Sequence, residues 1–107
     1  MSFFSRIFGQ KAVAQPEGLI FVLRDIGAPL GDRDDAARDF AEFDEALPVL
    51  VEIALRPGED EMLVDSCGES IAEIWQRTSG FDRATFDRLP LIAQSIIAGY
   101  FPEEAGK

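Results

Sequence analysis

The feature that most constrains the fold is an internal similarity between two segments. Shifting the sequence by 31 positions places residues 34–43 (DDAARDFAEF) over residues 65–74 (DSCGESIAEI), and small residues then meet small ones while large apolar residues meet large apolar ones. Stacked equivalent helices would produce this match, because small residues let backbones approach and large ones fill the space between layers. The alternative is that two amphipathic helices share a period by chance. We favour the repeat, which predicts that residues 33–43 and 64–74 are roughly parallel helices.

Helix signals recur at short intervals along the rest of the chain, as apolar residues spaced three and four positions apart between turns rich in Gly, Pro and Asp. They predict an all-α protein of five or six helices. We expect these over about 18–27, from Asp32 as N-cap to Phe43, from Asp44 as N-cap to Arg56, from Glu59 or Asp60 to Gly80, from Asp82 as N-cap to Leu89, and from Leu89 to Tyr100. The expected core includes Phe40, Leu50, Cys67, Ile71 and Ile74.

The two similar segments, with the first continued through residues 44–50, resemble the HEAT-type helical repeats, in particular the short repeats of phycobilisome lyases. The resemblance implies a short α-solenoid of antiparallel helix pairs, whose inner helices form a concave surface that binds another protein. The second copy departs from the pattern because it carries extra length after Ile74. About two repeats are present, whereas solenoids normally need about three. The end helices must therefore act as caps, or a second subunit in a homodimer must cover an end.

Charge divides the chain near residue 16. The first 16 residues contain Arg6 and Lys11 but no acid, whereas all 20 acidic residues follow. We therefore divide the chain into an N-terminal arm (1–16), mobile or a short helix; a helical-repeat domain (17–102); and a polar tail (103–107). In the arm, Phe4, Ile7 and Phe8 share one helical face that would suit contact with a membrane, but we favour a frayed terminus or packing on the domain. The absence of a long apolar run or a secretory signal favours a cytoplasmic location.

Charge and composition exclude several classes of chemistry. A net charge of -10 argues against nucleic acid as a ligand. With no histidine and a single cysteine, Cys67, the chain cannot form a histidine-based triad, a zinc cluster or an internal disulfide. The acidic groups at 32–35 and 59–65 match helix starts, so we interpret them as capping rather than metal-binding residues. We therefore expect no cofactor, no metal and no catalytic residue.

The sequence favours a non-enzymatic protein-interaction module. The exposed positions of the two similar helices would form an acidic surface for a basic protein partner, and an inhibitor or immunity-type protein is one concrete version. The expected partner-binding residues are Asp35, Arg38, Asp39, Glu42, Glu69, Ser70, Glu73 and Arg77. The alternative is an enzyme accessory or lyase-like protein that binds a small ligand in a helical groove. It would need a functional thiol or acid, and Cys67 is the sole thiol.

Overall fold

The computed structural model describes residues 16–106, and within this range it confirms an all-helical chain without strands. The described residues form seven α-helices, where five or six were predicted, and two short 3₁₀ helices. In chain order these are α2 (Pro16–Arg24), α3 (Leu30–Asp39), η2 (Phe40–Glu42), η3 (Asp44–Ala46), α4 (Leu47–Ala54), α5 (Glu61–Thr78), α6 (Arg83–Arg88), α7 (Leu91–Tyr100) and α8 (Pro102–Ala105).

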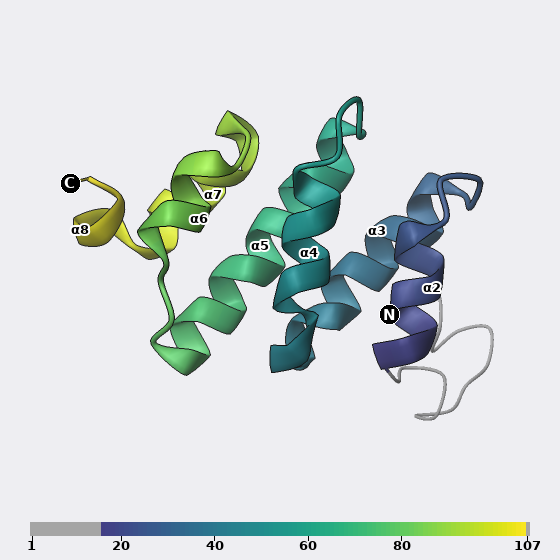
Figure 1. The fold of residues 1–107 in the computed structure, drawn as a ribbon, viewed down its shortest axis with the longest axis horizontal. Coiled ribbons are helices and arrows are strands. Elements are labelled where there is room, and N and C mark those ends of the chain that lie inside the picture. Colours follow the sequence, from purple (N-terminus) through teal and green to yellow (C-terminus); the bar gives the residue numbers. More distant parts are fainter. Residues whose placement is uncertain (1–15, 107) are drawn as a thin grey trace.

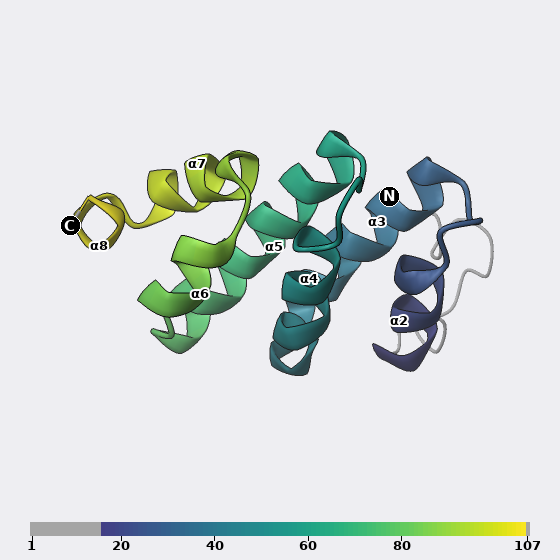
Figure 2. The same cartoon turned by 45° about the horizontal axis from the view of Figure 1, so that its top comes forward.

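The helices follow one another along the long axis of the molecule in two rows. In Figures 1 and 2, α2, α4 and α6 form one row, and α3, α5 and α7 form a second row behind it. The end helices α2 and α8 lie at opposite ends. Helix α5 is central, because it packs against α3, α4 and α7.

Hydrogen bonds show that α3 and α5 run side by side in the same direction. The hydroxyl of Ser66 donates to the carboxylate of Asp34, and one turn later the hydroxyl of Ser70 donates to the carbonyl of Ala37 at 2.7 Å. The contacts advance along both helices together, as they must when two helices are parallel. This direction agrees with the prediction for residues 33–43 and 64–74.

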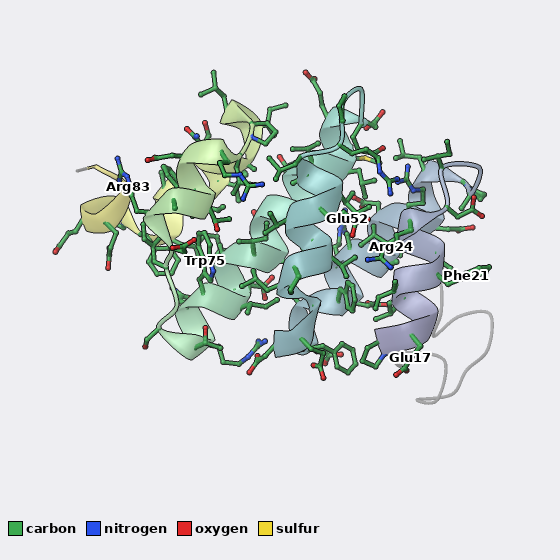
Figure 3. The ribbon with its side chains drawn as sticks, viewed as in Figure 1. Glu17, Phe21, Arg24, Glu52, Trp75 and Arg83 are labelled. Atoms are coloured by element: carbon green, nitrogen blue, oxygen red, sulfur yellow. The ribbon has the colours of Figure 1, made fainter. Side chains whose placement is uncertain are left out.

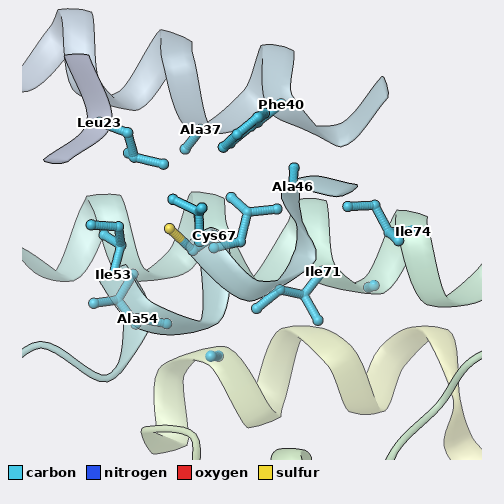
Figure 4. Close-up of a cluster of buried hydrophobic side chains, with 14 of the residues drawn as sticks. Leu23, Ala37, Phe40, Ala46, Ile53, Ala54, Cys67, Ile71 and Ile74 are labelled. Atoms are coloured by element: carbon cyan, nitrogen blue, oxygen red, sulfur yellow. The ribbon is translucent and has the colours of Figure 1, made fainter. Parts of the chain in front are cut away.

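The core lies between the two rows of helices. Every predicted core residue is buried, and Figure 4 shows Phe40, Cys67, Ile71 and Ile74 with their apolar neighbours. Gly68 explains how α5 and α7 approach so closely, since a Cβ atom at this position would lie 3.1 Å from the Cα atom of Ala93. The small residues of the two similar segments were expected to bring those two helices together, whereas Gly68 makes its close approach to α7.

Local signals in the second half of the chain are confirmed. The side chain of Asp60 accepts a hydrogen bond from the backbone of Met62 at the start of α5, and Asp82 accepts one from Thr85 at the start of α6. The ring of Phe81 lies 5.4 Å from that of Phe86, so the two form a hydrophobic staple across the start of α6. Phe81 also packs on the indole of Trp75, and Figure 3 shows the latter between α5 and α6.

Several predicted boundaries in the first half are wrong. Helix α3 begins at Leu30 rather than after Asp32, because Pro29 precedes it and its carbonyl accepts the first helical hydrogen bonds. It ends at Asp39, where the chain tightens into η2 and turns toward α4. Helix α2 ends at Arg24, so Gly27 lies in the following turn and not at the helix terminus.

The last helix and the first residues of the chain complete the comparison with the predicted organisation. Helix α8 (Pro102–Ala105) spans the predicted boundary between the helical-repeat domain and the polar tail. Arg83, labelled in Figure 3, donates a hydrogen bond to the carbonyl of Glu104 at 2.8 Å. Predictions for Phe4, Ile7 and Phe8 in the N-terminal arm lie outside the described residues. None of the helices between residues 16 and 106 has the length and apolar character needed to cross a bilayer.

Candidate functional site

A shallow acidic hollow of about 380 Å³ lies between α3 and α5. Helix α5 supplies three carboxylates at successive four-residue intervals, which places Asp65, Glu69 and Glu73 along one stripe. Helix α3 contributes one cation, Arg38. The full lining is Arg38, Asp65, Ser66, Glu69, Ser70 and Glu73. Four predicted partner-binding residues therefore meet in one place: Arg38, Glu69, Ser70 and Glu73.

Arg38 is held at the rim of the hollow by a buried carboxylate. Its guanidinium lies 2.7 Å from Asp34, whose side chain is only 6% exposed while that of Arg38 is 64% exposed. Asp34 also accepts the hydroxyl of Ser66 from α5. Asp34 was interpreted as a helix-capping residue, and this is wrong: it connects two helices and orients a cation. Burial of a carboxylate is tolerated here because it is paired and hydrogen-bonded.

Glu69 is held from the other side by α7. The hydroxyl of Tyr100 donates to Glu69 at 2.6 Å. This hydrogen bond, together with partial burial and the nearby charges of Glu69 and Glu73, raises the pKa of Tyr100 to about 12. The hydrogen bond from Tyr100 thus orients the carboxylate of Glu69. Tyr100 was not predicted as a site residue.

Two of the predicted partner-binding residues, Ser70 and Arg77, make hydrogen bonds that connect parts of the fold. Ser70 is fully buried, and its hydroxyl bonds to the carbonyl of Ala37, so the prediction that it is exposed is wrong. Arg77 forms an ion pair with Asp44 at 2.6 Å and donates to the carbonyl of Ala41 at 2.9 Å. It therefore joins the end of α5 to the turn that follows α3.

The other three predicted residues lie outside the hollow. Asp35 and Asp39 are half-buried on α3, and Glu42 is exposed on η2. None of these three is among the residues that line the hollow. The eight predicted residues therefore do not form one continuous surface, and α5 contributes more of the hollow than α3 does.

Cys67 lies beneath this surface and is not part of it. The thiol is fully buried. Burial, followed by the nearby carboxylates of Glu59 and Asp34, raises the pKa of Cys67 to about 12. A thiol with this pKa holds almost no thiolate near neutral pH, which is the form that reacts.

Sequence reasoning missed Asp65 and Tyr100, although a signal existed for the first. Asp65 precedes Glu69 and Glu73 at the same four-residue spacing, so extending the stripe by one turn would have included it. Tyr100 reaches Glu69 from a helix 31 residues later, and no local pattern reports that contact.

The described residues contain no group of three or more His, Cys, Asp or Glu side chains placed to hold a metal ion. Comparison with protein-family models, curated proteins and solved structures finds no match for this chain.

Proposed function

We propose that this chain is a non-enzymatic interaction module that binds a basic segment of a partner protein in the hollow between α3 and α5. One observation carries the proposal: Asp65, Glu69 and Glu73 of a single helix line the same open hollow, the first two half-buried and the third exposed. Like charges at four-residue spacing destabilise a helix by about 0.2 to 0.5 kcal/mol per pair. A cationic partner would relieve that repulsion.

The shape of the site also favours a protein side chain as the ligand. Arg38 at one side of the hollow would repel a lysine or arginine placed against it, so the cation is directed toward the α5 side. The side chains that flank the hollow are already held in place, Arg38 by Asp34 and Glu69 by Tyr100. Holding these groups in advance reduces the entropy lost on binding. An inhibitor or immunity-type protein that covers the cationic cleft of an enzyme is one form of this function.

We also propose that the two rows of helices form a short HEAT-like solenoid of antiparallel pairs. The parallel contact between α3 and α5, with hydrogen bonds that advance along both helices, supports this arrangement. In such a solenoid, equivalent helices of successive repeats lie side by side in this way. The lyase-like alternative would require a functional thiol, and the burial and raised pKa of Cys67 give it no support.

Charge reversal tests the function. Immobilised wild-type chain would be used to capture proteins from the native host lysate at low salt, beside the double variant Asp65→Lys, Glu73→Lys. The matched control is Glu45→Lys, Glu103→Lys, which makes the same change of charge at exposed positions outside the hollow. We expect the hollow variant to lose a basic partner that the control retains, with wild-type binding weakening as salt rises. Equal capture by both variants would show that the hollow is not the binding site.

A further inference from the structure

A second surface, separate from the hollow, lies on the outward side of α2 at the end of the molecule. It is formed by Glu17, Ile20, Phe21 and Arg24 along one face of the helix, and by Asp25, which directly follows the helix. These residues line an open hollow of about 640 Å³. Figure 3 shows Phe21 pointing away from the rest of the molecule, and its side chain is 75% exposed.

The opposite side of α2 accounts for its place in the fold. Leu19 and Leu23 are fully buried against the core, so α2 needs no contact on its outward side to stay attached. An exposed phenylalanine beside Ile20 in an open hollow is instead typical of a contact surface.

The charges on this face would complement those of the same face on a second copy of the chain. Glu17 and Arg24 lie at opposite ends of the apolar pair, equally distant in sequence from the midpoint between Ile20 and Phe21. If two copies of α2 pack antiparallel about a two-fold axis at that midpoint, Glu17 of one copy faces Arg24 of the second copy, twice. An isologous dimer requires such a self-complementary patch.

We propose that the outward face of α2 is a homodimer interface, in which the Phe21 side chain of each copy enters the hollow of the other. The net charge of -10 would push two copies apart elsewhere, whereas this face carries Glu17, Asp25 and Arg24 and therefore a net charge of only -1. The segment before Pro16 is a poorer match, because its charges, Arg6 and Lys11, are both basic and would meet Arg24 as well as Glu17.

Arg24 can serve both contacts. It already binds Glu52 of α4 through Nε at 3.1 Å and Nη2 at 2.8 Å. Figure 3 shows these two side chains between α2 and α4. A guanidinium has five N–H donors, and this bidentate contact takes one from each of two nitrogens. Glu52 therefore positions Arg24 without exhausting its donors.

The first test is sedimentation equilibrium of the full chain over a range of concentrations. We expect a reversible dimer for the wild type. Phe21→Ser should raise the dissociation constant by at least about tenfold, since both copies lose the buried ring. The matched control is Leu91→Ser, which removes an equally exposed apolar side chain (78%) from α7. The control should dimerise like the wild type.

The second test uses complementary charges. Glu17→Arg and Arg24→Glu should each weaken self-association, because each places like charges opposite each other. An equimolar mixture of the two variants restores both opposite-charge contacts and should give a heterodimer, with circular dichroism confirming that each variant is folded. A monomeric wild type would overturn the proposal. In that case residues 1–15 or a different protein would be the remaining candidates to cover α2. A dimer that resists Phe21→Ser, or variants that do not associate when mixed, would overturn it too.

Discussion

The guanidinium of Arg33 and the carboxylate of Glu59 form an ion pair at 2.9 Å, and each side chain is less than a tenth exposed. Arg33 also donates to the carbonyl of Leu23, near the end of α2, through Nε at 3.1 Å and Nη2 at 2.9 Å. One side chain thus connects α2, α3 and the loop before α5. Arg56 approaches the same carboxylate at 3.6 Å and extends the charge network to α4.

Breaking this pair from one side should be strongly destabilising. Glu59→Leu leaves the buried guanidinium of Arg33 without a carboxylate, and we expect it to lower the free energy of unfolding by about 3 to 5 kcal/mol. Arg33→Met should cost less, because Glu59 keeps its longer contact with Arg56. The double variant removes both charges and should recover much of that loss. Urea unfolding of the four proteins measures the coupling. Additive losses would show that the two side chains do not depend on each other.

The same pair predicts a dependence of stability on pH. Hydrogen bonding to Arg33 lowers the pKa of Glu59, although burial opposes the change. A carboxyl whose pKa is lower in the folded state stabilises the fold above its unfolded pKa, and this contribution is lost as pH falls through the folded value. We therefore expect the unfolding free energy to decrease as pH drops below about 4.

Glu59→Gln should flatten this acid dependence. Some dependence should remain, because hydrogen bonding to Arg24 also lowers the pKa of Glu52. Glu103→Gln, which removes an exposed carboxylate on α8, serves as the control. Urea unfolding at a series of pH values compares the wild type with these two variants. Identical pH profiles for Glu59→Gln and the wild type would show that Glu59 does not cause the acid dependence.

The contact between Gly68 and Ala93 predicts an unusual result for a glycine-to-alanine change. Alanine should gain about 1 kcal/mol of helix propensity, but its Cβ atom would lie 3.1 Å from the backbone of α7. Because overpacking costs about 1 to 3 kcal/mol, we expect Gly68→Ala to destabilise the fold. At Gly99 a Cβ would meet nothing within 4 Å, so Gly99→Ala should stabilise it. Thermal unfolding compares the two, and stabilisation by both would mean that α5 and α7 have room to separate.

Signals read from a few neighbouring residues were reliable in the second half of this chain. In the first half, Asp32 and Asp44 were predicted as N-caps in the same way, and neither caps a helix. Asp60 and Asp82 cap their helices because a cap depends only on the next two or three residues. The core face of α5 was predicted for the same reason, since Cys67, Ile71 and Ile74 keep one helical period.

The buried polar residues were harder to predict than the helix caps and the apolar core. Ser70 lies one turn from Ser66 on the buried side of α5, and their spacing beside Cys67 and Ile71 was a usable signal. Small polar side chains on an apolar stripe are typical of helix contacts where hydroxyls bond across the interface. Arg33 similarly continues the stripe of Ala36, Ala37 and Phe40, but its partner lies 26 residues away and becomes adjacent only after folding.

Cys67 should be inert in the native state. With its pKa raised to about 12 by burial, and with no exposed surface, the thiol can react with an aromatic disulfide reagent only when the protein opens. We expect slow labelling in buffer and fast labelling in urea, with the native rate following stability across the Gly68→Ala and Gly99→Ala variants. Because the chain has one cysteine, the signal has a single source. Rapid native labelling would instead favour a ligand-binding role for this thiol.

Tyr100 reports directly on the carboxylate of the acidic hollow. It is the single tyrosine, so an ultraviolet titration of tyrosinate follows this one group. We expect a pKa of about 12 in the wild type, since ionising Tyr100 would place two negative oxygens at the 2.6 Å contact with Glu69. Glu69→Gln should bring the pKa back toward the ordinary value of about 10, whereas Glu61→Gln should leave it unchanged.

The sign of the linked stability follows from this shift. The pKa of Tyr100 is higher in the folded state, so its hydrogen bond to Glu69 contributes fully below about pH 10. The contribution is lost as pH rises toward the folded value of about 12. The wild type should therefore lose more stability than Glu69→Gln over this interval, as measured by urea unfolding at alkaline pH. If Tyr100 titrates near its ordinary value in both proteins, α7 does not hold Glu69, and the hollow lacks one of the contacts that orient its carboxylates.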